Sequence, residues 1–359
     1  MDIAADLGVP CVMFHVMGTF PILAMFNMAR HGGEDVGGVA TIPGFPPPEI
    51  RIPLTELPRD LFFRSQQQEQ SSIAIRSALG RSFGLAVNTF LDLERDYCGL
   101  YVADGFVKRA YFLGPLLLPL LPESSTANSS GSNSRCCIDW LDKKTNNSVL
   151  YLCFGSFAPL SDAQIRELAL GLEASGKPFL WVVKSDSWKT PPEGWAERVG
   201  DRGLVVTDWA PQTAILAHPA VGAFVTHCGW NSVLETVVAG VPVLTWPLVA
   251  EQFISERFVM QVLGIGARLC PEDTGIVRSV RRGERDLVPA EVVARAVAAF
   301  MEPGGAGEAA RVKAKKLSVK ARAAMADGGS SHRDLHRFID DLMEATTARV
   351  ETVQLRPKM

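Results

Sequence analysis

Residues 209–252 read WAPQTAILAHPAVGAFVTHCGWNSVLETVVAGVPVLTWPLVAEQ. Two apolar runs in this stretch, Ala223–Thr226 and Val241–Trp246, predict short buried strands, and Ser232–Ala239 between them predicts a helix. Buried strands that alternate with helices are typical of a parallel sheet covered on both faces. The stretch therefore predicts an α/β fold of the doubly wound, Rossmann-like type.

The sequence before this stretch continues the same alternation. Further strands are predicted at Ser148–Phe154, Pro178–Val183 and Leu204–Thr207. A helix is predicted over Ser161–Gly176, where Ser161 and Gln164 suggest a capping box and Gly176 ends the helix. In the N-terminal part, the sequence predicts strands at Val9–Phe14, Leu85–Asn88 and Ala110–Leu113 and helices at Met1–Leu7, Ser65–Leu79 and Leu91–Val102.

The 359 residues suggest two domains. A Ser- and Asn-rich linker, residues 123–135, separates an N-terminal domain (1–122) from a C-terminal domain (136–330). Residues 331–359 form a closing helix and tail, with a predicted capping box at Ser331 and Asp334. The N-terminal part has about three strands where a full domain of this type has about six, and it opens within a predicted helix. We therefore expect an N-terminal domain that is incomplete.

Composition excludes several classes of protein. The net charge of −3 gives no basic footprint for nucleic acid. No run of about 18 uncharged apolar residues predicts a membrane span, and the first ten residues are acidic rather than basic, unlike a signal peptide. The seven cysteines are odd in number and scattered, which argues against a disulfide framework or a zinc site. We expect a cytoplasmic monomer without a metal or cofactor.

Four groups of polar or aromatic residues each follow a predicted strand of the C-terminal sheet. They are Gly155-Ser156, Trp209–Gln212, His227–Ser232 and Glu251-Gln252. In open parallel sheets, ligands bind outside the carboxyl ends of the strands. The four groups therefore predict one binding site.

The residue types in these groups suggest a nucleotide sugar. A helix that begins within His227–Ser232 offers free N–H groups to a diphosphate. Glu235, one helical turn after Asn231, can accept hydrogen bonds from a ribose diol. Trp209 offers a flat face to a base and Gln212 an amide to its edge, whereas Glu251 and Gln252 suit sugar hydroxyls.

Residues 209–252 closely resemble the signature box of plant secondary-product UDP-glycosyltransferases, the plant branch of glycosyltransferase family 1. The resemblance continues in Cys137–Asp142, Phe154–Ser156, Leu168–Val183 and Gly328–Leu335. It implies a GT-B fold of two Rossmann-like domains, with the donor held mainly by the C-terminal one. The implied activity is an inverting, metal-independent transfer of glucose from UDP-glucose to a hydroxyl of a small apolar plant metabolite, such as a flavonoid or terpenoid.

The resemblance also implies roles for single residues. Trp209 corresponds to the residue that stacks on uracil, Glu235 to the one that holds the ribose, and Gln252 to one that is typical of glucose users. Trp230 and Trp246 are at least as well explained by packing. The residues implied to contact the UDP-sugar are Ser156, Trp209, Ala210, Gln212, His227, Gly229, Trp230, Asn231, Ser232, Glu235, Glu251 and Gln252.

No catalytic residue is assigned. The family uses a His in a Gly-His-x-x-Pro context as general base, oriented by an Asp. None of the six histidines here has that context, and the Asp belongs upstream of the segment that Asp2–Pro10 resembles. We therefore expect either a longer gene product or an inactive UDP-sugar-binding remnant or interaction module. A nicotinamide-dependent oxidoreductase is disfavoured, because the first strand of the C-terminal sheet is followed by FGSFAPL rather than G-x-G-x-x-G. The acceptor is expected among His15–Phe20, Pro43–Pro48 and Phe62–Gln68.

Overall fold

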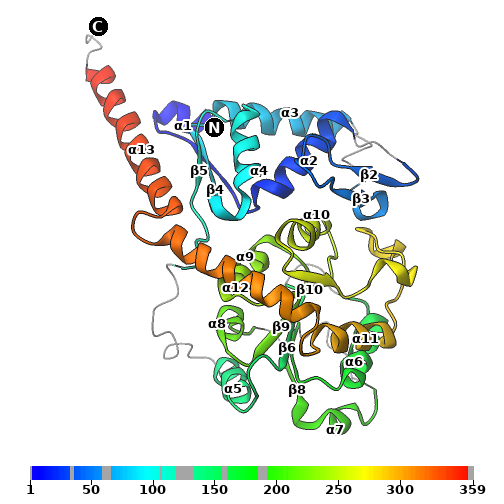
Figure 1. The fold of residues 1–359 in the computed structure, drawn as a ribbon. Helices are drawn as coiled ribbons and strands as arrows, with labels where there is room; N and C mark the ends of the chain where they lie inside the picture. The colour runs from blue at the N-terminus through cyan, green and yellow to red at the C-terminus, as the bar shows by residue number, and fades with distance from the viewer. Residues whose placement is uncertain are drawn as a thin grey trace.

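A computed structural model describes residues 2–32, 36–58, 66–105, 107–118, 132–155, 160–184, 192–207 and 209–354. Figure 1 shows two α/β units, with the N-terminal one above the C-terminal one. None of the described helices combines the length and the apolar character needed to cross a bilayer.

The C-terminal unit is built on a six-stranded parallel sheet with the order β11-β10-β9-β6-β7-β8. The chain starts at the centre of the sheet, adds two strands on one side, and then returns to add three on the other. This order confirms the doubly wound prediction, and its switch point lies between β6 and β9. The strands are β6 (Val149–Cys153), β7 (Phe179–Val183), β8 (Gly203–Thr207), β9 (Val221–Thr226), β10 (Val243–Thr245) and β11 (Gly266–Arg268).

Helices cover both faces of this sheet. Alternate residues of β6 enter different cores, with Leu150 and Leu152 facing α6 and α11 and Tyr151 facing α8, α9 and α12. The helices are α5 (Ser132–Leu141), α6 (Asp162–Ser175), α7 (Trp195–Val199), α8 (Gln212–Ala217), α9 (Trp230–Ala239), α10 (Gln252–Arg257), α11 (Ala290–Phe300) and α12 (Ala306–Met325). Short helical turns are η5 (Gly200–Arg202), η6 (Phe258–Leu263), η7 (Glu272–Thr274) and η8 (Arg282–Glu284). Helix α5 begins inside the expected linker 123–135, whose residues 123–131 lie outside the described part.

Helix α6 matches its predicted ends only in part. The Ser161 hydroxyl accepts a hydrogen bond from the Gln164 backbone N–H at 3.2 Å, and Gly176 closes the helix with a φ of 67°. The reciprocal half of the capping box is wrong, because the Gln164 side chain instead bonds the backbone of Val288. The helix is therefore anchored to the segment that precedes α11.

The N-terminal unit has the predicted three-stranded parallel sheet, in the order β1-β4-β5. Its strands are β1 (Val12–His15), β4 (Gly84–Val87) and β5 (Ala110–Phe112), and its helices are α1 (Asp2–Leu7), α2 (Thr19–His31), α3 (Gln66–Arg81) and α4 (Leu91–Ala103). Helix α2, the antiparallel pair β2 (Val39–Thr41) and β3 (Arg51–Pro53), and the turn η1 (Leu54–Glu56) were not predicted from the sequence.

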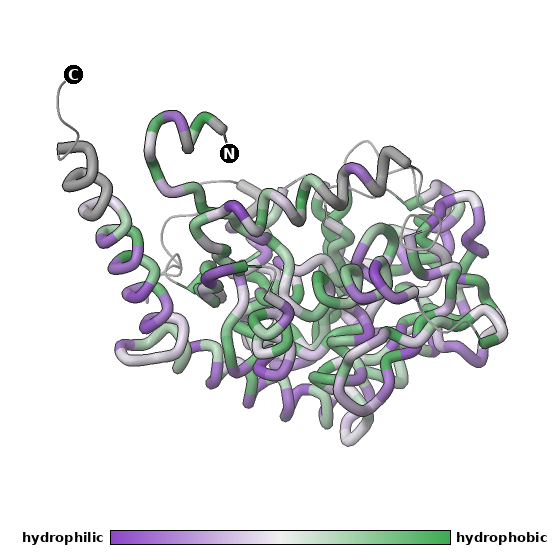
Figure 2. Tube along the Cα trace, turned by 90° about the horizontal axis from the view of Figure 1, so that it is seen from above, coloured by the Kyte–Doolittle hydropathy of each residue, from purple (hydrophilic) through white to green (hydrophobic). Residues whose placement is uncertain are grey.

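The last helix, α13 (Ser330–Gln354), returns to the N-terminal unit (Figure 1). Ser331 donates its hydroxyl to the Gly114 carbonyl at 2.6 Å, and Asp334 accepts the Phe112 backbone N–H at 2.8 Å. The predicted capping box of Ser331 and Asp334 is therefore wrong, because both side chains bind β5 and the loop that follows it. In Figure 2 the helix leaves the body of the molecule with hydrophilic and hydrophobic residues alternating along it.

Candidate functional site

The described members of the four predicted groups lie at the carboxyl ends of parallel strands. Gly155 follows β6, His227 follows β9, and Trp209 and Glu251 lie in the connections after β8 and β10. Because the six strands are parallel, these connections leave the sheet at the same edge. Ser156 lies outside the described residues.

His227 is enclosed by glycine backbones at the switch point. A Cβ atom on Gly155 would lie 2.8 Å from Cε1 of the His227 ring, and one on Gly229 would also collide with that ring. Gly155 has in addition a φ of 70°, which a side chain disfavours. Burial lowers the pKa of His227 to about 4, so the ring is neutral at pH 7 and carries one N–H.

Helix α9 begins at the same loop, and no side chain caps its N-terminus. Its N-cap is Gly229, which contributes no side-chain hydrogen bond to the first turn. The first N–H groups of a helix lack partners within the helix and carry a partial positive charge. Asn231 is exposed in this first turn, and Ser232 is nearly buried. The arrangement suits a diphosphate group.

Glu235 is held in a polar network below this turn. Gln212 donates from Nε2 to Glu235 and, at 3.1 Å, to the Ser232 hydroxyl. The Tyr151 hydroxyl donates to Gln212 Oε1 at 3.0 Å. Burial raises the pKa of Glu235, which the hydrogen bond from Gln212 opposes. A partly buried carboxylate in a fixed position can accept two hydroxyl donors from a ribose.

Trp209 and Ala210 lie just before α8, whose first residue, Gln212, belongs to this network. The Trp209 side chain is 66% exposed although it is the largest apolar type, and Ala210 next to it is buried. An exposed indole offers a face for stacking. This geometry fits the predicted uracil contact of Trp209.

Gln252 is oriented by the backbone before α10. Its Oε1 accepts hydrogen bonds from the N–H groups of Leu248 at 2.9 Å and Val249 at 3.0 Å. Within the described residues, the Nε2 group of Gln252 forms no hydrogen bond, so its amide protons can donate to a ligand. Glu251, at the start of the same helix, is half-buried, and burial raises its pKa. The pair thus presents a fixed donor beside an acceptor.

Trp230 packs between the two domains. Its ring lies against Gly18, and its indole N–H donates to the Asn88 carbonyl at 2.7 Å. Trp246 is also buried and lies edge-on to Phe154. The packing interpretation therefore accounts for both side chains, and Trp230 can offer a ligand its backbone N–H at the start of α9.

Sequence reasoning missed Tyr151 and Asn88. A tyrosine in the middle of a buried strand needs a partner for its hydroxyl. This signal could have indicated a polar network beside β6. Asn88 gave no such signal, because its contact with Trp230 joins positions 142 residues apart.

The family model for UDP-glucoronosyl and UDP-glucosyl transferase matches residues 126–269 of the chain. UDP-glycosyltransferase 73E1 of Stevia rebaudiana is 37% identical over 370 residues, which cover 97% of this chain and 72% of that protein. UDP-glucose flavonoid 3-O-glucosyltransferase 7 of Fragaria ananassa is 36% identical over 357 residues, which cover 95% of this chain and 72% of that protein.

Solved structures agree with the sequence matches. Glycyrrhiza uralensis UGT73P12, crystallised with glycyrrhetinic acid 3-O-monoglucuronide, superimposes with a TM-score of 0.85 at 31% identity. The superposition covers 99% of this chain and 73% of that one. The expected GT-B architecture is thereby confirmed.

Proposed function

Because the chain belongs to the plant UDP-glycosyltransferase family, we propose that it moves glucose from UDP-glucose to a hydroxyl of a small apolar plant metabolite. The observation that carries this proposal is the geometry around Glu235. Its carboxylate accepts a hydrogen bond from Gln212 and lies on α9 itself, about one turn after the first N–H groups of that helix. The ribose hydroxyls can then donate to Glu235 while the diphosphate of the same nucleotide accepts from the first N–H groups of α9.

The diphosphate end of the donor is bound by His227 and the first turn of α9. A neutral histidine donates one hydrogen bond without adding charge, and the helix terminus adds its partial positive charge. Negative charge builds on the diphosphate as the bond to the sugar breaks. Donors that are already aimed at that position stabilise the transition state more than the ground state.

The nucleoside end is bound by Trp209, Glu235 and Gln212. Trp209 stacks on the uracil, and Glu235 accepts from the ribose hydroxyls. Gln212, which is used in the structure to hold Glu235, reaches the edge of the base when the nucleotide binds. The predicted contact of Gln212 with uracil stays a prediction.

The glucose is bound by Gln252 and Glu251. The fixed Nε2 of Gln252 donates to a sugar hydroxyl, and Glu251 accepts from another. This arrangement favours glucose over galactose, which differ in the direction of a single hydroxyl.

The acceptor is bound on the N-terminal side of the same cleft. The segment His15–Phe20 contains Gly18, which lies against Trp230 of the donor motif. An acceptor hydroxyl held there can approach the anomeric carbon from the face opposite the diphosphate, which gives inversion. The acceptors are flavonoid- or terpenoid-type, in keeping with the names of the strawberry relative and of the licorice complex.

We also propose that the protein acts as a monomer in the cytoplasm. All seven cysteines are free in the structure, as a reducing compartment requires.

The test is a transfer assay on residues 1–359 with UDP-glucose and a panel of flavonols and triterpenoids, read by mass spectrometry. A product heavier by one hexose, with UDP released in equal amount, would confirm the transfer. Because no catalytic base is assigned within residues 1–359, we expect its rate to be about 10²–10⁴-fold below that of a relative with the Gly-His-x-x-Pro base. UDP release without any glycoside across the panel would indicate hydrolysis of the donor. If neither UDP nor a glycoside forms, the proposed transfer is wrong and donor binding is all that remains.

A further inference from the structure

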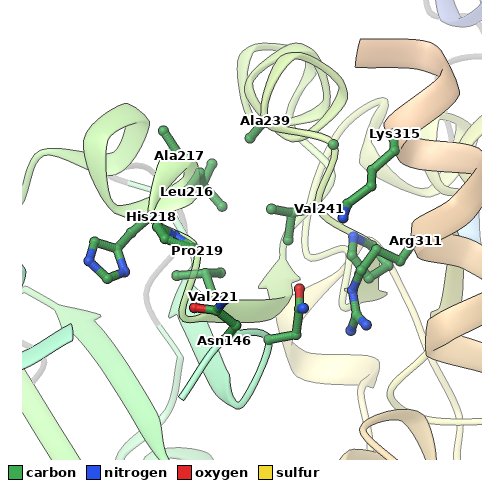
Figure 3. Close-up of a pocket in the computed structure, with 13 residues that line it drawn as sticks. Asn146, Leu216, Ala217, His218, Pro219, Val221, Ala239, Val241, Arg311 and Lys315 are labelled. Atoms are coloured by element: carbon green, nitrogen blue, oxygen red, sulfur yellow. The ribbon is translucent and has the colours of Figure 1, made fainter. Parts of the chain in front are cut away.

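The C-terminal domain has a second pocket, at the sheet edge opposite the donor site (Figure 3). It is lined by residues that precede β6, β9 and β10, by the ends of α8 and α9, and by one face of α12. Strand β6 has five residues, and a strand rises about 3.3 Å per residue, so roughly 17 Å separates the two edges. The pocket is therefore distinct from the donor site.

Two cationic side chains of α12 line this pocket. Arg311 and Lys315 are four residues apart and lie on one face of the helix. Figure 3 shows both on the side across from Leu216, Ala217 and Val221. The lining contains no carboxylate among the described residues. With two cationic side chains and no carboxylate among its described lining residues, the pocket has a net positive field.

Arg311 keeps unused donor capacity. Its Nη2 donates to the Gly222 carbonyl at 2.9 Å, but its Nε is buried without a hydrogen-bond partner in the described part of the chain. Burial lowers the pKa of this guanidinium, and the nearby Glu308 carboxylate opposes that shift. The remaining N–H groups of the guanidinium can donate to an anion.

The carboxylates around the pocket are engaged elsewhere. Glu308, one turn before Arg311, accepts the Gly304 backbone N–H at 2.7 Å. Asp142 lies 3.0 Å from Nε2 of His218, whose Nδ1 accepts the Ala220 backbone N–H. Within the described ranges, neither acid forms an ion pair with Arg311 or Lys315.

Lys315 is not needed as a cap for α9. It lies against Gly240 at the end of that helix, where lysines often bind the last carbonyl groups. The Thr236 and Val237 carbonyls, however, accept from Gly240, and the Val238 carbonyl accepts from the Ser318 hydroxyl at 2.6 Å. These carbonyls are satisfied without the lysine.

We propose that this pocket binds a small oxyanion of the phosphate class through Arg311 and Lys315. Its volume of about 200 Å³ corresponds to about seven water molecules at roughly 30 Å³ each, which accommodates phosphate or pyrophosphate. The exposed amides of Asn146 and Asn147 add donors at the rim.

The test is calorimetric titration of pyrophosphate into residues 1–359 with the donor site saturated by UDP. We expect one binding event that Lys315→Gln weakens at least fivefold. The matched control is Lys316→Gln, the exposed neighbour on α12 that does not line the pocket, and we expect it to bind as the wild type does. Arg311→Gln should weaken binding further.

Because Arg311→Gln also removes the bond to Gly222, the exposed Lys315→Gln is the deciding variant, with unchanged circular dichroism as the check on folding. Absence of binding, equal affinity in Lys315→Gln and Lys316→Gln, or competition between pyrophosphate and UDP would overturn the proposal. If UDP does not bind to the protein, pyrophosphate is titrated into Lys315→Gln and Lys316→Gln in the absence of UDP. The donor site and this pocket are therefore tested separately.

Discussion

Glu56 of the N-terminal domain and Arg257 of the C-terminal domain form a buried ion pair, with 2.7 Å between Oε2 and Nη2 and side-chain exposures of 5% and 1%. Arg278 also approaches Glu56, at 3.4 Å, and Arg278 in turn binds Glu256. Arg257 ends α10, the helix that begins at Gln252. The pair therefore connects α10, which carries the proposed glucose contact Gln252, to the N-terminal domain.

Removal of Glu56 should destabilise the junction between the domains. A buried charge left without any partner typically costs about 3–5 kcal/mol, but Arg257 keeps Glu256 at 3.4 Å. We expect Glu56→Ala to lower the free energy of unfolding in urea by less than that amount and to separate the unfolding of the two domains. The exposed Glu49→Ala serves as control. Equal midpoints for the two variants would show that the pair contributes nothing.

Glu94 should contribute to the stability of the protein by binding the N-terminus of α2. Its carboxylate accepts the backbone N–H groups of Thr19 at 3.0 Å and Phe20 at 2.7 Å, and the Thr89 hydroxyl at 2.5 Å. A hydrogen bond to a charged group contributes about 1.5–3 kcal/mol. We expect Glu94→Ala to lower the free energy of unfolding by about 3 kcal/mol or more, and Glu94→Gln by less. Asp92→Ala, on the same helix but exposed, should be nearly neutral.

His227 should make stability depend on pH in the acidic range. Its pKa is about 4 in the folded chain, against 6.5 for an ordinary histidine. The unfolded state then binds more protons, so the free energy of unfolding falls as the pH drops from about 6.5 to about 4. At about 1.36 kcal/mol per pKa unit, the loss is about 3 kcal/mol. His227→Gln should lack this component, and identical pH profiles for both proteins would contradict it.

Five strands of the C-terminal sheet and its doubly wound type could be predicted because those strands are local apolar runs, with clear helices at α6 and α9 between them. Strand β11 was not predicted, because its residues Gly266–Arg268 are no apolar run. The candidate site was predicted from the same pattern, since polar groups after parallel strands share an edge. Helix α2 could not be predicted in this way. Its N-cap is Gly18, which contributes no side-chain bond, and its first N–H groups bind Glu94, which lies 75 residues from Thr19.

Other features were missed for the same reason. Strands β2 and β3 have three residues each, too few for an alternating pattern. Asp334 was taken for a capping residue, yet it binds a strand 222 positions away. Long-range hydrogen bonds of this kind leave no local period in the sequence.

Gln252 should influence the choice of donor sugar. We expect Gln252→His to lower the preference for UDP-glucose over UDP-galactose in a competition assay, because the imidazole cannot reproduce the bonds of Oε1 to Leu248 and Val249. Gln261→His, at an exposed position of η6, is the control. An unchanged donor ratio would remove the role assigned to Gln252.

The most direct test of the account is the affinity of residues 1–359 for UDP, measured by calorimetry in the wild type and in Glu235→Ala. The account predicts an affinity about 10- to 100-fold weaker in the variant, because a hydrogen bond to a charged group contributes about 1.5–3 kcal/mol. Glu291→Ala, an exposed carboxylate of α11, should bind UDP as the wild type does. Equal affinity of the wild type and Glu235→Ala would contradict the assignment of the ribose to Glu235 and, with it, the proposed donor site.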